Sequence, residues 1–366
     1  MADQANQGGA AKRTVTLIGP AQSGKTHMVA ALLINQPVQD LTQGPDALEN
    51  PRLVRSDATT SDEEEEVWQR LSRHYNTMFF GRDLLELEAT YQVHRYRLTV
   101  LWNGAAKQGS GLGLRRWLGG GKEAMSAVAL ELIDGRGGDL AYDAFVQATT
   151  DREAAQRRDD YRKALAASQG VMICQGLGDN DYQQMNIDAL NRNIESILLT
   201  VDSQRKPKLR QVAICLTKYE TLFSKYGADA MQKAVDRDFL IRRIREMGMD
   251  QMFRTILAHG VGEAAGRRGS GVVVRVFPVS TYGFVGGYGA ANFYPWPQAP
   301  GLLTRAVEAT DYDDPELEGL RDHYPVPISQ GQAMQNWRPF NLAPPLLFAA
   351  TGKVTGPLSV RAEDLV

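Results

Sequence analysis

The 366-residue sequence has little of what marks secreted, membrane-spanning or disulfide-stabilised proteins. It has only two cysteines, Cys174 and Cys215, and each lies inside an apolar stretch, which favours buried, reduced thiols. No apolar run approaches the length of a membrane span, and the first twelve residues have no apolar core of a signal peptide. These absences predict a cytoplasmic protein without a membrane span.

The sequence also has no excess of charge of either sign. Its 41 basic and 43 acidic residues give a net charge of −2, so composition does not indicate a nucleic-acid partner. The five histidines are scattered, and no Cys/His spacing is typical of a zinc site. Because 43% of the residues are hydrophobic, the chain can bury a sizeable core, in one large domain or two small ones.

The most informative stretch is Gly19–Thr26, Gly-Pro-Ala-Gln-Ser-Gly-Lys-Thr, which matches the phosphate-binding pattern G-x-x-x-x-G-K-[ST]. A strand is expected before it at 14–18 and a helix after it at 27–33, so its backbone N–H groups face an anion at a helix N-terminus. Lys25 can reach the β- and γ-phosphates, and the Thr26 hydroxyl can bind Mg²⁺. The residues expected to bind the nucleotide here are Gly19, Gln22, Ser23, Gly24, Lys25 and Thr26.

Apolar strand-like runs alternate with helical patterns along the rest of the chain. Further strands are expected at 91–102, 127–134, 171–174, 211–216 and 272–279, and helices from Ser61, at 150–168, 187–197, 229–247 and within 341–350. This alternation predicts a three-layer α/β P-loop NTPase fold, with a mostly parallel central sheet, helices on both faces and Gly-rich insertions.

Composition suggests how the chain divides. A disordered lead is expected at 1–12 and the nucleotide-binding domain at 13–282, with loops or insertions at 35–61 and 103–121. Residues 283–366 are expected to form a C-terminal extension that packs on the same domain.

Parallel sheets bind ligands beyond the carboxyl ends of their strands. Asp134 ends one apolar strand and begins the turn Asp-Gly-Arg-Gly, so its carboxylate is expected to help hold Mg²⁺ opposite Thr26. The backbone N–H of Gly137 can contact the γ-phosphate. Arg136, inside the same turn, is the first candidate for a positive charge on the transferring phosphate, with Arg115 and Arg116 as alternatives.

Thr217-Lys218-Tyr219-Glu220 follows the apolar strand 212–216. Here the chain resembles the Ras-like, translation-factor-related (TRAFAC) class of P-loop GTPases, whose base-reading loop is [N/T]-K-x-D. The resemblance implies that the Lys218 stem packs on guanine and that the Glu220 carboxylate accepts bonds from its N1–H and N2–H groups. Glu220 stands where the family has aspartate.

The resemblance extends to two further positions. Ser280 and Thr281 match the family's S-A-[KL] motif in part, which implies contact with the guanine ring. Thr90, before the second strand, corresponds to a switch threonine that closes on Mg²⁺, with Thr59 and Thr60 as alternatives. The chain looks closest to bacterial double-GTPase-type domains, which implies a protein partner or a second GTPase protomer.

Two glycines bear on the reaction that the resemblance implies. Gly138 stands where Ras-like enzymes have a water-orienting glutamine, and Gly135 stands where many ATPases have a glutamate. We therefore predict an enzyme, a guanine-nucleotide-binding switch protein that hydrolyses GTP slowly with Mg²⁺ and is controlled by a partner. The alternatives are a scaffold that binds GTP or GDP with little hydrolysis, and a P-loop protein that uses ATP.

Overall fold

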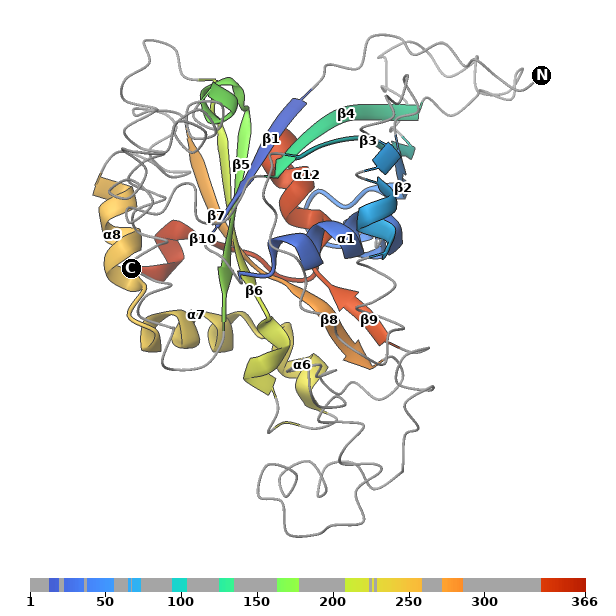
Figure 1. Cartoon of the computed structure of the whole chain (residues 1–366). Helices are drawn as coiled ribbons and strands as arrows, with labels where there is room; N and C mark the ends of the chain where they lie inside the picture. The colour runs from blue at the N-terminus through green and yellow to red at the C-terminus, as the bar shows by residue number, and fades with distance from the viewer. Residues whose placement is uncertain are drawn as a thin grey trace, which may run out of the picture.

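The computed structural model describes residues 13–19, 23–35, 38–55, 65–66, 68–73, 94–103, 125–134, 163–177, 208–223, 226, 229–258, 272–285 and 337–366. Within these ranges the chain forms an eight-stranded sheet with helices packed on both of its faces (Figure 1). A smaller, two-stranded sheet begins two residues after one of the eight strands ends.

The strands of the large sheet are β1 (Arg13–Ile18), β2 (Glu49–Arg55), β3 (His94–Asn103), β4 (Met125–Asp134), β5 (Gly170–Gly176), β6 (Gln211–Thr217), β7 (Val273–Pro278) and β10 (Val360–Arg361). The small sheet consists of β8 (Ser280–Val285) and β9 (Trp337–Phe340). The α-helices are α1 (Lys25–Asn35), α6 (Ala230–Ala234), α7 (Arg237–Glu246), α8 (Asp250–Ala258) and α12 (Ala343–Thr351). The 3-10 helices are η1 (Gln39–Thr42), η2 (Tyr219–Phe223) and η5 (Ala362–Leu365).

The strand order of the large sheet is β10-β7-β6-β5-β1-β4-β3-β2. β1 pairs in parallel with β4 on one side and β5 on the other, and β5, β6 and β7 continue in parallel. β3, β2 and β10 pair antiparallel with their neighbours. The chain therefore builds one side of β1 first and then crosses to the other, which makes the carboxyl end of β1 a topological switch point. The mostly parallel α/β fold expected from the sequence is confirmed.

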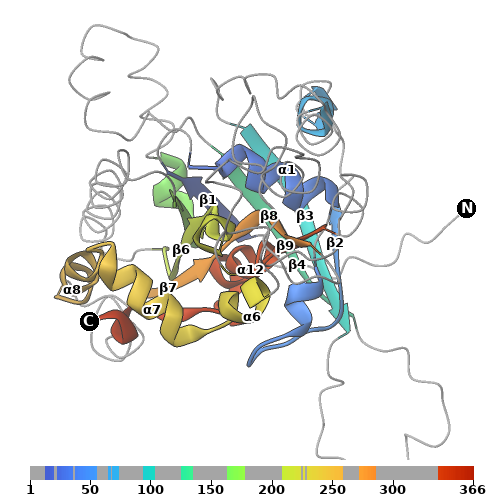
Figure 2. The same ribbon diagram turned by 90° about the horizontal axis from the view of Figure 1, so that it is seen from below.

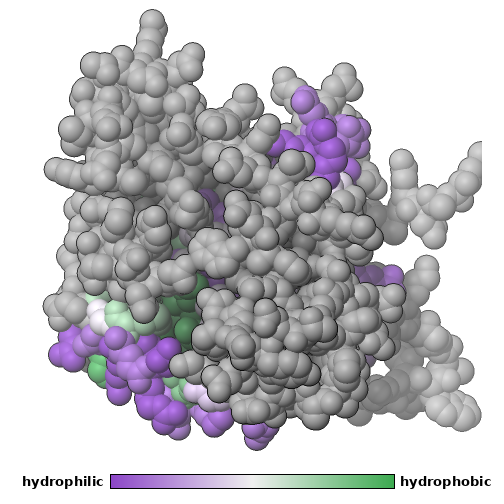
Figure 3. Space-filling view, turned by 60° about the horizontal axis from the view of Figure 1, so that its bottom comes forward, coloured by the Kyte–Doolittle hydropathy of each residue, from purple (hydrophilic) through white to green (hydrophobic). Residues whose placement is uncertain are grey.

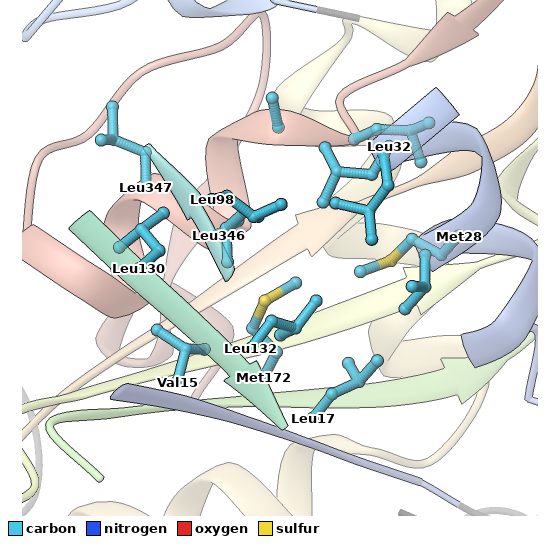
Figure 4. Close-up of a cluster of buried hydrophobic side chains, with 14 of the residues drawn as sticks. Val15, Leu17, Met28, Leu32, Leu98, Leu130, Leu132, Met172, Leu346 and Leu347 are labelled. Carbon is cyan, nitrogen blue, oxygen red and sulfur yellow. The ribbon is translucent and has the colours of Figure 1, made fainter. Parts of the chain in front are cut away.

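One face of the sheet is covered by α1 and α12. Leu17 of β1, Met28 and Leu32 of α1, and Leu346 and Leu347 of α12 belong to one buried cluster (Figure 4). α12 is buried from Ala343 to Ala350. A helix that is apolar all round belongs in the interior, and α12 fits between η1 and strands β1, β5 and β6.

The other face is covered by α7, α8 and η5, so α8 and α12 lie on opposite sides of β5–β7 (Figures 1 and 2). α7 buries Phe239, Leu240 and Ile244 and presents mostly charged residues outward. Figure 3 shows hydrophilic residues on the side of the molecule where α7 and α8 lie. The Asp236 side chain begins α7 by accepting hydrogen bonds from the N–H groups of Asp238 and Phe239.

The expected surface loop at 35–61 is wrong in part, because it contains η1 and the edge strand β2. β2 buries Pro51 and Leu53 while Arg52 and Val54 point outward, and a proline is tolerated in an edge strand because one side of that strand needs no ladder bond. The helix expected at 229–247 is two helices, since Asp236 caps a new start within it. α8, β8, β9 and β10 were not expected.

The strands expected from the apolar runs are confirmed as β1 and β3–β7, and the last helix is confirmed as α12 with its prolines in the first turn. The lead at 1–12, the start of the helix at Ser61, the stretch 104–121 and the helix at 187–197 lie outside the described residues. Among the described helices, none has the length and apolar character needed to cross a membrane.

Candidate functional site

The phosphate-binding pattern lies at the switch point. β1 ends at Ile18 and α1 begins at Lys25, and the described residues of the loop between them are Gly19, Ser23 and Gly24. Gly19 has φ of 151°, and a Cβ atom at this position would lie 2.4 Å from the Cys174 carbonyl oxygen of β5. Only glycine fits so close to a neighbouring strand. The loop is therefore held tightly against the sheet.

Lys25 folds back over this loop. Its Nζ donates to the Gly19 carbonyl at 2.8 Å and to the Ser23 hydroxyl at 3.3 Å, and the side chain is buried. The first backbone bond of α1 runs from the Met28 N–H to the Gly24 carbonyl, so the N–H groups before it lie at the helix N-terminus. An ammonium and a helix N-terminus at one place favour a bound anion.

The predicted metal ligands lie at the same edge of the sheet. Asp134 is the last residue of β4, and its backbone is in register with Leu17 of β1, two residues before the phosphate loop. Thr26 is the second residue of α1. A hydroxyl and a carboxylate are oxygen ligands of the type that Mg²⁺ prefers, so these residue types fit the ion. Thr90, Arg136 and Gly137 lie outside the described residues, as does Gln22.

The second part of the site follows β6. The Thr217 hydroxyl donates to the Ser23 carbonyl at 2.5 Å and lies 3.2 Å from the Gln175 carbonyl of β5. Lys218 then adopts φ of 58°, which is uncommon for a residue with a side chain, and it is exposed. The turn is closed by Thr221, whose N–H and hydroxyl both donate to the Lys218 carbonyl. The loop after β6 is thus joined directly to the phosphate loop.

Glu220 lies buried in the same turn. Burial raises the pKa of its carboxyl group to about 7, although a hydrogen bond from Ser280, its own backbone N–H and the charge of Lys218 lower the pKa. One carboxyl oxygen, Oε2, is buried without a hydrogen-bond partner among the described residues. A buried acceptor of this kind calls for a donor that the described chain does not provide.

Ser280 and Thr281 complete this side of the site. Both are buried at the start of β8, where the Ser280 hydroxyl accepts a bond from the Gly283 N–H at 2.6 Å. The Tyr219 N–H donates to the Val279 carbonyl, which fixes η2 against the end of β7. The structure therefore brings together four sequence-predicted positions, which are Thr217, Glu220, Ser280 and Thr281.

Two residues that the sequence analysis missed support this arrangement. Asn341, with φ of 57°, donates from Nδ2 to the carbonyls of Pro278 and Leu358, at 2.9 and 2.8 Å. Its backbone N–H donates to Asp40 of η1 at 2.5 Å. No local pattern identifies such a pair, because Asp40 and Asn341 are almost a whole chain apart in sequence.

The strand order defines a three-layer α/β protein, and the stretch that matches the phosphate-binding pattern follows β1 at the switch point of its sheet. No protein-family model matches the chain, and no curated protein matches it in sequence.

Solved structures resemble the chain in part. The SRb-GTP/SRX complex of the signal recognition particle receptor from Chaetomium thermophilum is 16% identical, with a TM-score of 0.33 over 74% of this chain and 91% of that one. The GTPase-like domain of Ski7 from S. cerevisiae is 12% identical when bound to GTP, with a TM-score of 0.32 over 74% of this chain. The same domain bound to GDP and inorganic phosphate is 12% identical, with a TM-score of 0.33 over 79% of this chain. The chain spans 43% and 47% of the two Ski7 chains.

Proposed function

We propose that this chain is a GTPase-like switch protein that binds GTP with Mg²⁺ and hydrolyses it slowly. The observation that carries the proposal is the hydrogen bond from the Thr217 hydroxyl to the Ser23 carbonyl at 2.5 Å. It places the loop that matches a base-reading motif against the loop that matches a phosphate-binding motif. One nucleotide can then lie across both, with its phosphates at Lys25 and its ring at Lys218 and Glu220.

Each residue at the phosphate end has a physical role in this proposal. The Lys25 ammonium neutralises charge on the β- and γ-phosphates, and the N–H groups at the start of α1 orient them. Thr26 and Asp134 would hold Mg²⁺, with Thr90 as a third ligand, and the bound ion would neutralise phosphate charge. Phosphoryl transfer needs mainly such positioning and electrostatic stabilisation.

Slow hydrolysis follows from the residues that come after β4 in the sequence. Gly138 has no side chain with which to orient the attacking water, although Gly137 can still offer a backbone N–H to the γ-phosphate. Arg136 is the candidate for an added charge, and an unchanged single-turnover rate in Arg136→Ala would remove it from the mechanism. We also propose that a protein partner, or a second protomer, controls the reaction in the cytoplasm, as in the double-GTPase type of domain.

The direct test is phosphate release by the full-length protein from GTP and Mg²⁺. We expect slow release that is lost in Lys25→Ala and kept in Lys208→Ala, which removes an exposed ammonium before β6. In competition for a fluorescent GDP analogue, GTP should displace the probe at lower concentration than ATP. Absence of GTP binding by folded protein would contradict the proposal.

A scaffold without significant hydrolysis is the second candidate, and Gly138 is the observation that favours it. Tight GTP binding with no release of phosphate above the Lys25→Ala background would select this alternative. If ATP outcompetes GTP instead, the chain is an ATP-using protein.

A further inference from the structure

The two oxygens of the Glu220 carboxyl group lie in different surroundings. The Ser280 hydroxyl bonds the group, while Oε2 is buried with no partner among the described residues. An ionised carboxylate with one oxygen left unpaired in the interior is unfavourable, so the pocket calls for either a proton on the group or a ligand that donates to it.

Few charges in the described structure oppose protonation of the Glu220 carboxyl group. Lys218, the residue before η2, is the charged group that acts on the carboxyl, and the neighbouring Ser280 and Thr281 of β8 carry no charge. Tyr219 directs its hydroxyl to the Ala234 carbonyl at 3.2 Å instead. Burial raises the pKa of Glu220, whereas Ser280, its own backbone N–H and Lys218 lower it. The resulting pKa is about 7, so both protonation states are populated near neutral pH.

The two states of Glu220 offer different hydrogen-bonding patterns. A carboxylate is an acceptor at both oxygens, which suits the neighbouring N1–H and N2–H donors of guanine. A neutral carboxylic acid has one acceptor and one donor, so one guanine N–H group would face an O–H group. A purine that lacks the 2-amino group, such as hypoxanthine, has only the N1–H donor and can use the single acceptor of either state.

We propose that Glu220 is a proton-controlled specificity residue, whose ionised form selects the two-donor edge of guanine and whose neutral form does not. The preference for guanine then rises as the pH rises through the neutral range. This inference rests on the proposed function, because it places a guanine nucleotide at the loop after β6.

The test compares GDP with IDP, the hypoxanthine nucleotide, by calorimetric titration of the full-length protein with Mg²⁺, from about pH 5.5 to about pH 8.5. The two ligands have the same phosphates, so the ratio of their dissociation constants is independent of phosphate ionisation. We expect the ratio of IDP to GDP to be near one at the acid end. It should rise to about 10-fold or more at the alkaline end, with its midpoint near the pKa of about 7.

Two variants sharpen the test. Glu220→Gln cannot titrate and should show a low, pH-independent ratio. Ser280→Ala removes a donor that lowers the pKa of Glu220, so its midpoint should move to higher pH. The pH profile of the wild type tests the proposal without any variant. Circular dichroism and thermal unfolding check that each variant is folded.

The outcomes separate the two proposals. If neither nucleotide binds at any pH, the proposed function fails and this inference falls with it. If both bind with a ratio that is constant across the pH range, or if Glu220→Gln keeps the wild-type profile, Glu220 does not set specificity by protonation while the proposed function stands.

Discussion

The two ends of the candidate site are built in different ways. At the phosphate end, Lys25 bonds Gly19 and Ser23, which are six and two residues away in sequence. At the base end, Thr217 bonds Ser23 across 194 residues. The phosphate end is therefore a local structure that a short motif specifies. The base end exists only where β6, β7 and β8 come together.

The base end is also supported by a chain of contacts from distant parts of the sequence. Asp40 accepts from the backbone of Asn341, and the Asn341 side chain donates to the Pro278 carbonyl at the end of β7. We expect substitutions at the phosphate end to weaken nucleotide binding the most. Substitutions at the base end should change stability and specificity by smaller, graded amounts.

The largest effect is expected for Gly19→Ala. The added methyl would meet the Cys174 carbonyl at 2.4 Å in a backbone conformation that side chains rarely adopt. We expect a loss of about 2–4 kcal/mol in the free energy of unfolding and at least about 100-fold weaker GTP binding. Gly248→Ala is the matched control, because Gly248 has φ of 72° but nothing within 4 Å of the added atom. It should lose only about 1 kcal/mol. Similar losses in both would show that backbone strain, and not the close contact, dominates.

Asp40 provides a test of the support behind the base end. Burial raises the pKa of its carboxyl from 3.8 to about 6, against the lowering effect of the Asn341 and Leu342 N–H groups. Because the pKa of Asp40 is higher in the folded than in the unfolded protein, its protonated carboxyl contributes to the free energy of unfolding. This contribution is fully present below about pH 4 and is lost as the pH rises through 6. A shift of this size corresponds to at most about 3 kcal/mol.

Chemical denaturation between about pH 4 and pH 8 measures the effect. The free energy of unfolding of Asp40→Asn should fall less over this range than that of the wild type. The remaining fall should come from Glu220, whose pKa is also raised. An unchanged pH slope in the variant would show that Asp40 does not titrate as described.

Thr217→Val tests the bond that joins the two ends. The substitution keeps the shape of the side chain but leaves the Ser23 carbonyl without its donor, so we expect a loss of about 1–2 kcal/mol in unfolding free energy and weaker GDP binding. Thr42→Val is the control, since the Thr42 hydroxyl bonds the Gln39 carbonyl on an exposed turn. It should leave GDP binding unchanged. Equal GDP affinity in wild type and Thr217→Val would mean that the two loops act independently.

The smallest effect on stability is expected for Lys218→Asn. Asparagine tolerates the positive φ at this position, so the unfolding free energy should change by less than about 0.5 kcal/mol. The long stem that would pack on the ring is lost, and GDP affinity should fall by about 10-fold. Lys208→Asn, an exposed position before β6, is the control for charge alone. A similar fall in both variants would attribute the effect to net charge.

Much of the central sheet could be predicted from the sequence, because β1 and β5–β7 are short apolar runs buried on both faces, flanked by turn residues. β2 escaped prediction because Pro51 and its exposed residues resemble a loop, and only pairing with β3 makes it a strand. β10 has just two residues, and its partner strand β7 lies about 85 residues earlier in the sequence. The split between α6 and α7 depends on the bonds of one side chain, Asp236.

The sequence by itself determined where β1 ends and α1 begins around the phosphate-binding pattern, because strand, glycines, lysine and helix follow one another in a short stretch of chain. The tertiary structure alone decided which distant residues complete the site, including the contact of Thr217 with Ser23, the burial of Glu220 beside Ser280 and the support from Asp40 and Asn341. The physical reason is that burial and desolvation depend on what packs around a group, which no short stretch of sequence specifies.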